Sequence, residues 1–207
     1  MGVSLVTGPS VEPISPVDVR TWGQIAATAI TGEYADAVIN QRIKAAREII
    51  EARAKIALVN QTWALTLDSF GASDRDGFSP DWGYRPAWAG DRPIYLPLFP
   101  WQSITSIQYV APDGTTQTLS SSLYRFDSAE GRITPEYLQL WPITRTVINA
   151  VTITFVVGYG ADGTFCPAMA RECLLEIVED RLKNRGGLYQ IPNGTLEKIR
   201  SLWSGRV

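Results

Sequence analysis

The stretch YADAVINQRIKAAREIIEARAKIALVNQTW, residues 34–63, decides the fold. Up to residue 57 its apolar residues recur at helical spacing and charged residues fill most other positions, which is the pattern of an amphipathic helix on a core. No glycine or proline interrupts it. From Gln61 the period changes to two: Trp63, Leu65 and Leu67 alternate with smaller or polar residues, as in a half-buried strand. The chain therefore passes directly from a long helix into a sheet.

Helices are predicted on both sides of a block of strands. Ser15 and Pro16 have the positions of an N-cap and a first helical residue, and Asp18 suits the positive end of the helix dipole. Pro167 opens a further helix, whose apolar residues suit packing against the long one. The three predicted helices cover residues 15–29, 36–57 and 167–185.

Residues 63–159 are predicted to form an antiparallel β unit. Pro112-Asp113-Gly114 marks the turn of one hairpin, and residues 128–131 mark a second. The last strand, 151–157, is apolar enough to be central in its sheet. The fold class is α+β, a helical bundle with an inserted antiparallel β unit. The predicted domains are residues 1–61 with 161–207, in which 1–14 form an extended arm, and residues 62–160.

Composition narrows the class of protein. The 207 residues are 45% apolar, which is enough for one good core. The net charge is −2 with acids and bases interspersed, which argues against a sequence-specific nucleic-acid reader with a basic face. No apolar run approaches a membrane span, and no basic region followed by an apolar one indicates a signal peptide.

Residue types that carry catalysis are sparse. The sequence has no histidine, which removes the usual catalytic triads and most zinc sites. No phosphate-binding loop has the required spacing. Cys166 and Cys173 lie about 10 Å apart along a predicted helix, too far for a disulfide, and are interpreted as reduced core thiols of an intracellular protein. We therefore expect no enzymatic turnover, no metal and no cofactor.

A long irregular segment, residues 71–92, is rich in glycine, aspartate and aromatic residues. Asp74-Arg75-Asp76-Gly77 is weakly similar to a calcium loop but lacks the other ligands and the terminal glutamate, so a surface loop is favoured. Long loops without secondary structure are often functional, and Trp and Tyr anchor protein interfaces. Trp82, Tyr84 and Trp88 are therefore predicted to contact another protein subunit.

The C-terminal segment, residues 195–207, follows a break at Gly186-Gly187. It is expected to be independently mobile and to have few neighbours in its own subunit, although a short helix needs a partner to persist. Its apolar side and one basic residue are predicted to bind a partner protein or a neighbouring subunit; folding back on its own bundle is the alternative. The predicted binding residues are Leu196, Ile199, Leu202, Trp203 and Arg206.

An ordered set of segments resembles a known family. Residues 9–19 (PSVEPISPVDV), 60–70 (NQTWALTLDSF), 96–119 (LPLFPWQSITSIQYVAPDGTTQTL), 124–135 (YRFDSAEGRITP) and 149–160 (NAVTITFVVGYG) occur in this order. Together they resemble the head–tail connector (adaptor) family of long-tailed bacteriophages and phage-derived gene-transfer agents. The specificity lies in the ordered set, since no single piece is a catalytic signature.

The resemblance implies a structural virion protein. Such proteins form a homo-oligomeric ring of about twelve copies, a closed cyclic assembly with head-to-tail interfaces. The ring lies between the portal protein and a tail-side stopper or tail-completion protein, and is built in the host cytoplasm. The resemblance implies that the predicted binding residues of the C-terminal segment contact the portal first and a neighbouring subunit second. It also makes a tail-side protein a candidate partner of the aromatic residues Trp82, Tyr84 and Trp88. DNA passes through its channel without sequence-specific binding, which suits a surface that is not basic. No membrane is involved.

Two other classes of protein remain open from the sequence. The β unit could be a carbohydrate- or peptide-binding module, with Trp82, Tyr84, Trp88 and Trp101 as a stacking platform. An accessory fold of a hydrolase that acts through carboxylates is a weaker alternative, because nothing in the sequence pairs the carboxylates.

Overall fold

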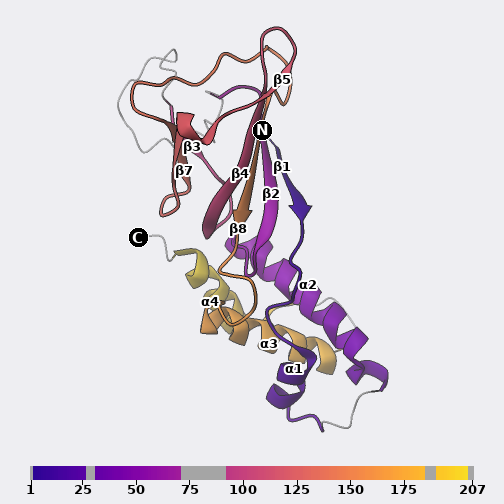
Figure 1. Ribbon diagram of the computed structural model, residues 1–207. Coiled ribbons are helices and arrows are strands. Elements are labelled where there is room, and N and C mark those ends of the chain that lie inside the picture. The colour runs from indigo at the N-terminus through magenta and orange to yellow at the C-terminus, as the bar shows by residue number, and fades with distance from the viewer. Residues whose placement is uncertain (1, 27–30, 71–91, 185–189, 205–207) are drawn as a thin grey trace. The chain divides into compact units, whose positions relative to one another are not determined.

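The computed structural model describes residues 2–26, 31–70, 92–184 and 190–204 (Figure 1). The chain divides into two compact units: Met1–Gly8 with Gln61–Val157, called here the sheet unit, and Pro9–Asn60 with Gly158–Val207, the helical unit. The described residues form α-helices and antiparallel sheets, which confirms the predicted α+β class. No helix in these ranges is long and apolar enough to cross a membrane.

The larger sheet of the sheet unit is built around β8. Its antiparallel strands follow the order β1 (Gly2–Thr7), β2 (Gln61–Leu67), β8 (Val151–Val157), β4 (Trp101–Val110) and β5 (Thr116–Thr118). Alternate β8 residues are fully buried, and the strand pairs on both sides, with β2 and with β4. The prediction of a central last strand is confirmed.

Both predicted hairpins are present. Gly114 turns the chain between β4 and β5 at φ +91°, a conformation that favours glycine, and Asp113 Oδ1 accepts the N–H of Thr115 at 2.8 Å. The second hairpin pairs β6 (Tyr124–Asp127) with β7 (Arg132–Pro135). In the smaller sheet β7 also pairs with β3 (Ile94–Tyr95), so that β7 lies between the other two strands.

The N-terminal segment differs from the predicted extended arm. Residues Gly2–Thr7 form strand β1, which pairs with β2 from Gly2 opposite Thr66 to Thr7 opposite Thr62. Residues up to Gly8 therefore belong to the sheet unit, whereas the sequence analysis placed all of residues 1–61 in the helical part. The pairing joins segments far apart in sequence, so no local pattern announces it.

The helical unit contains α1 (Pro16–Trp22), α2 (Asp36–Ala54), α3 (Ala168–Lys183) and α4 (Asn193–Ser204), with a 3-10 turn η1 (Gly32–Tyr34) before α2. The predicted start of α1 is confirmed as a capping box: the Ser15 side chain accepts the N–H of Asp18, and Asp18 accepts the N–H of Ser15. The helix ends at Trp22, earlier than predicted, with Gly23 as its C-cap.

Helix α2 ends at Ala54, three residues before the predicted end. Lys55 adopts the left-handed conformation at φ +54°, which stops the helix. The buried residues that follow, 56–59, turn the chain toward β2, and Glu51 Oε1 accepts the N–H of Leu58 at 2.9 Å. The apolar spacing across this turn imitates another helical turn.

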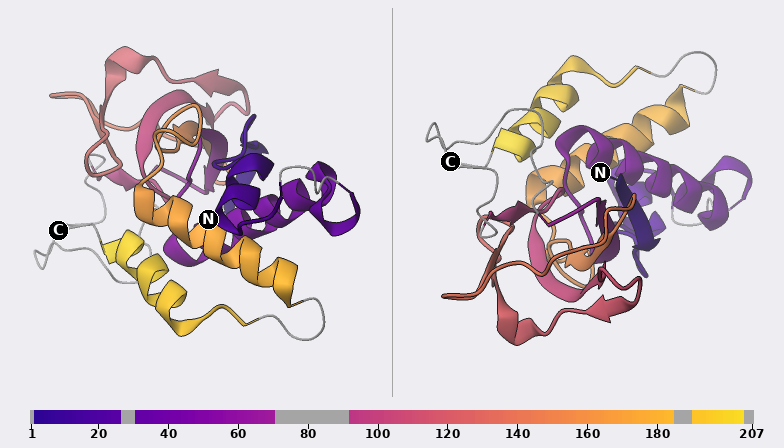
Figure 2. Two further views of the ribbon diagram at one scale, coloured as in Figure 1. Left: turned by 90° about the horizontal axis from the view of Figure 1, so that it is seen from below. Right: turned by 90° about the horizontal axis from the view of Figure 1, so that it is seen from above.

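The predicted helical core is confirmed. α2 packs against α3, and the four predicted core residues are fully buried: Ile43, Ile50, Leu174 and Ile177. Figure 2 shows α3 (orange) beside α4 (yellow), so the last helix also belongs to this bundle.

Substitution of Ile50 by Asp should unfold the helical unit. The new carboxylate would be buried without a partner, so Ile50→Asp should lower the free energy of unfolding by more than about 3 kcal/mol. Asn40→Asp is the matched control, because Asn40 is exposed on the same helix and should change stability by less than about 0.5 kcal/mol. Chemical denaturation measures both; equal stabilities of the two variants would contradict the observed packing.

Candidate interaction surfaces

Helix α4 lies on its own bundle. It packs against α3 and α2, with Ile199 only 1% exposed and Thr195 also buried. The prediction of an independently mobile segment with few neighbours is therefore wrong for its described part. The apolar side was identified correctly, but α2 and α3 of the same chain cover much of it.

Charged side chains hold α4 on α3. Lys198 Nζ lies 2.7 Å from Glu172 Oε1 and 2.6 Å from Glu176 Oε1, and the Thr195 hydroxyl donates to Glu176 Oε2 at 2.7 Å. Glu172 and Glu176 are one turn apart on α3, so one ammonium reaches both. The sequence analysis missed this cluster, because nothing in the sequence shows which carboxylates Lys198 faces.

The same contacts set the pH dependence of the docking of α4. Burial raises the pKa of Glu176, but hydrogen bonds from Lys198 and Thr195 and the charge of Lys198 outweigh it and leave this pKa below its ordinary value. A lowered folded-state pKa means that the ionised carboxyl stabilises the fold above its ordinary pKa. This contribution is lost as the pH falls through the lowered value.

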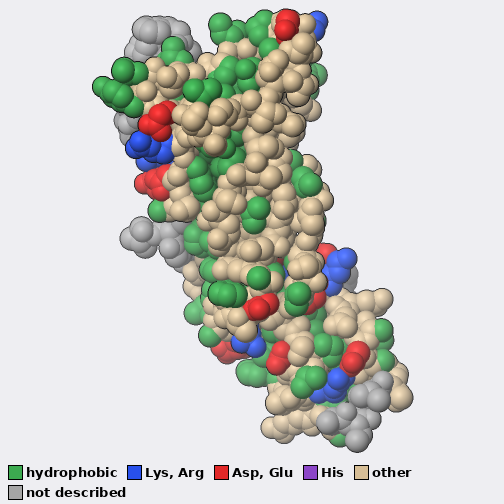
Figure 3. Space-filling view, viewed as in Figure 1, with side chains coloured by type: hydrophobic (Ala, Val, Ile, Leu, Met, Phe, Trp, Pro, Cys, Tyr) green, Lys and Arg blue, Asp and Glu red, His purple; other side chains and the backbone are tan. Residues whose placement is uncertain are grey.

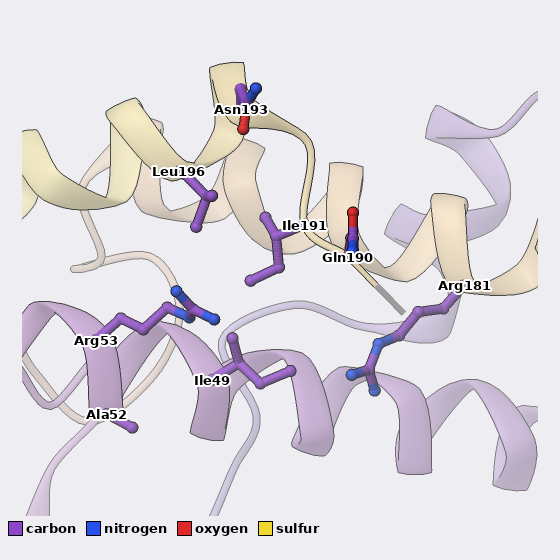
Figure 4. Close-up of a pocket in the computed structure, with 8 residues that line it drawn as sticks. All are labelled: Ile49, Ala52, Arg53, Arg181, Gln190, Ile191, Asn193 and Leu196. Carbon is purple, nitrogen blue, oxygen red and sulfur yellow. The ribbon is translucent and has the colours of Figure 1, made fainter. Parts of the chain in front are cut away.

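A cavity of about 490 Å³ lies within the helical unit (Figure 4). In this view Ile49 and Arg53 rise from α2 toward Leu196 of α4. Its lining residues are Ile49, Ala52, Arg53, Arg181, Gln190, Ile191, Asn193 and Leu196. None of them is a carboxylate or a nucleophile, so the lining holds no acid–base pair for catalysis.

The predicted binding residues of α4 have different environments. Ile199 is buried, whereas Leu196 and Leu202 are partly exposed. Trp203 lies in α4, but its side chain is outside the described residues, as is Arg206. The predicted aromatic contacts Trp82, Tyr84 and Trp88 also lie outside the described residues.

Trp101 does not form part of an exposed platform. It is 5% exposed, its ring packs edge-on against Phe99 at 5.5 Å between centroids, and Gly131 lies so close that a Cβ there would overlap the indole. The predicted use of Trp101 for stacking is wrong, because β4 turns this side chain into the interior.

A surface that the sequence analysis missed lies in the segment between β7 and β8. Five of its apolar side chains are 70–84% exposed: Tyr137, Leu138, Leu140, Ile143 and Ile148, called here the loop patch. Figure 3 shows hydrophobic side chains at the surface of the sheet unit, with few charged ones between them. The irregular spacing of these residues explains why neither helical nor strand periodicity revealed them.

The segment that carries the loop patch is anchored. Trp141 is buried; its Nε1 donates to the carbonyl of Arg92 at 2.7 Å, and its ring stacks on Phe70 at 4.9 Å between centroids. The backbone N–H of Asn149 donates to Asp68 Oδ1 at 2.9 Å. These contacts hold the conformation of a segment whose apolar side chains still point to solvent.

The outer edge of β1 is a second exposed apolar surface. Val3, Leu5 and Val6 are 37–57% exposed and are called here the edge patch. Among the described strands β1 pairs only with β2, and residues 2–7 carry no charged side chain. Exposed edge strands usually carry charges or bulges that prevent further pairing. The bulge between Leu5 and Thr7 is the one such protection here.

The two thiols and the described carboxylates offer little for metal binding or nucleophilic chemistry. In the described part of the chain, no group of three or more His, Cys, Asp and Glu residues could hold a metal ion. Burial raises the pKa of the thiols of Cys166 and Cys173 to about 11, which makes them poor nucleophiles, and the Cys166 thiol donates to the carbonyl of Leu58.

The fold is that of chains in solved gene transfer agent particles. One is from the neck of an empty particle, computed with C6 symmetry. The TM-score is 0.71 and the sequence identity 20%, and the match covers 98% of this chain and 95% of that chain. A second is from the virion of a native particle: TM-score 0.71, 18% identity, with the same coverage. A third is from the neck of a native particle, computed with C12 symmetry. The TM-score is 0.66 and the sequence identity 19%, and the match covers 98% of this chain and 94% of that chain.

At these identities the likeness establishes a shared fold. No protein-family model matches the chain, and no curated protein matches its sequence.

Substitution of Ile199 tests the docking of α4. Ile199→Ala should lower the free energy of unfolding by about 2–5 kcal/mol, because the removed side chain is buried between helices of the same chain. Glu197→Ala is the control: Glu197 is exposed and pairs only with Arg200 among the contacts described, so its loss should cost less than about 1 kcal/mol. If Ile199→Ala melts like the unmodified protein, α4 does not dock on its own bundle in solution.

Proposed function

We propose that this chain is a head–tail connector, or adaptor: a structural virion protein that forms a ring between the portal and the tail-side proteins. The observation that carries this proposal is the match of 98% of the chain to chains of gene transfer agent particles, two of them from particle necks. The ordered sequence segments that resemble the connector family support the same role independently of the fold.

The ring is supported by symmetry. The necks of the similar particles were computed with C6 and C12 symmetry. A ring of about twelve copies of this chain would be a closed cyclic assembly in which each copy uses two different surfaces.

The overall charge of the chain supports a proposed role in DNA passage. Proteins bind DNA tightly by neutralising its phosphates with Lys and Arg, and this chain has 19 basic and 21 acidic residues. A ring of chains with this overall charge balance suits a channel through which DNA slides without specific binding. The assembled ring would belong to the virion, after assembly in the host cytoplasm, and would perform no enzymatic turnover.

The end of α4 remains our candidate for contact with the portal. Because Ile199 is buried within the helical unit, it is unavailable to a partner without undocking of the helix. Leu196 and Leu202 are partly exposed, and Trp203 and Arg206 follow at the end of the chain. These four residues make up the corrected version of the predicted binding face.

Joining to portal-bearing heads tests the proposed function. Purified chain added to portal-bearing, DNA-filled heads should bind as a ring visible by electron microscopy, and should not bind heads assembled without portal. Removal of its gene from a producing cell should leave filled heads without tails. Failure to bind the portal-bearing heads, or normal tailed particles without the gene, would rule out the connector role.

A double substitution tests the portal-binding end. Trp203→Ala with Arg206→Ala should weaken attachment to heads by about tenfold or more, because Trp and Arg frequently dominate interface energies. Its melting temperature is measured beside that of Ile199→Ala to separate binding from packing. Attachment equal to the unmodified protein, or destabilisation as large as that of Ile199→Ala, would exclude this end as the portal anchor.

A further inference from the structure

We propose that the loop patch of one copy of this chain docks against the edge patch of a second copy. The inference rests on the proposed ring and names the contact between its neighbouring subunits. Each loop patch would thus bind the edge patch of the next copy around the ring.

Both surfaces have the character of an unfilled interface. Monomeric proteins rarely expose several large apolar side chains together, and the five loop-patch residues are 70–84% exposed. Strand β1 has no partner on its outer side among the described strands, and it carries three exposed apolar side chains. A backbone segment from another chain can pair with such an edge.

The two patches occupy different places on the sheet unit. β2 and β8 separate β1 from β4, so these strands lie about 14 Å apart. The strand register places Leu5 level with Ile104 of β4, whereas the loop is bonded to Val110, about 20 Å further along. A contact between two different surfaces is head-to-tail, and its repetition gives a ring where the rotation between copies closes.

The near-absence of charged side chains suits contact between the two patches. Residues 2–7 have no charged side chain, and between Tyr137 and Ile148 Arg145 is the single one. Glu136, just before the patch, already pairs with Arg125. Contact between the patches therefore removes apolar surface from water without burying an unpaired carboxylate.

The loop is also pre-organised for docking. Its bonds from Trp141 and Asn149, together with the N–H of Arg145 donated to the carbonyl of Val110 at 2.9 Å, fix the backbone before any partner arrives. A surface that is ordered in advance loses less conformational entropy on binding than a flexible one.

Crosslinking between two variants that each carry one added cysteine tests this contact. Leu5→Cys and Ile143→Cys are purified separately, mixed, assembled on portal-bearing heads and treated with a short thiol crosslinker. The native Cys166 and Cys173 are buried and should not react. We expect a crosslinked dimer in the mixture and none in either variant alone. Crosslinking of either variant with itself, or none in the assembled mixture, would overturn the proposal.

Charge substitutions provide a second measurement. Leu5→Asp and Ile143→Asp each place a carboxylate in the proposed contact and should reduce the assembled fraction by about tenfold or more. Thr116→Asp is the matched control, an exposed strand residue outside both patches. All three variants should melt like the unmodified protein, since the substituted side chains are exposed or half-exposed.

The outcomes separate this inference from the proposed function. If Ile143→Asp still forms rings but no longer binds the tail-side protein, the loop patch serves that protein and the inference is wrong, while the connector role stands. If the chain ignores portal-bearing heads but the cysteine mixture crosslinks in concentrated solution, the contact between copies stands and the connector role is wrong. Absence of both assembly and crosslinking contradicts both.

Discussion

The helical unit depends on one buried arginine. Arg47 lies in the middle of α2 at 5% exposure, and its guanidinium contacts Glu12 at 2.8 Å and Glu51 at 2.6 Å. Burial lowers the pKa of Arg47, but the hydrogen bonds and charges of these two carboxylates raise it overall. Loss of either carboxylate would leave a buried charge partly uncompensated. Glu51 also accepts the N–H of Leu58, so the same cluster fixes the segment before α1 and the turn after α2.

Local patterns predicted much of the fold. The capping box at Ser15, the helical period of α2, the hairpin turn at Gly114 and the alternation of β8 each depend on neighbours in sequence, and each is present. The end of α2 was predicted three residues late because residues 56–59 are buried in a turn and keep an apolar pattern. Strand β1 escaped prediction because its partner β2 follows only after two helices.

The candidate interaction surfaces were predicted only in part, because the sequence does not show what covers an apolar side. An amphipathic segment shows that something covers its apolar side, but hydrophobicity has no direction and does not identify the partner. For α4 the partner is its own bundle, and the deciding contacts from Lys198 and Thr195 to Glu176 are visible only in three dimensions. The loop patch lacks any period, so its exposure follows from the anchors around it, above all the stacking of Trp141 on Phe70.

The exposed apolar side chains are distributed differently in the two units. In the helical unit the large apolar side chains that reach solvent come from separate elements, as with Val17 of α1 and Met169 of α3, and Trp22 is already bonded to Glu179. Single exposed apolar residues of this kind are normal. In the sheet unit Tyr95 and Leu123 are exposed singly in the same way, but the other exposed apolar residues come from one anchored segment and one edge strand. The proposed contact between copies uses two different surfaces of this kind, and both are formed by described residues of the sheet unit. The contacts that dock α4, among them the cluster around Lys198, lie within the helical unit and involve neither the loop patch nor the edge patch.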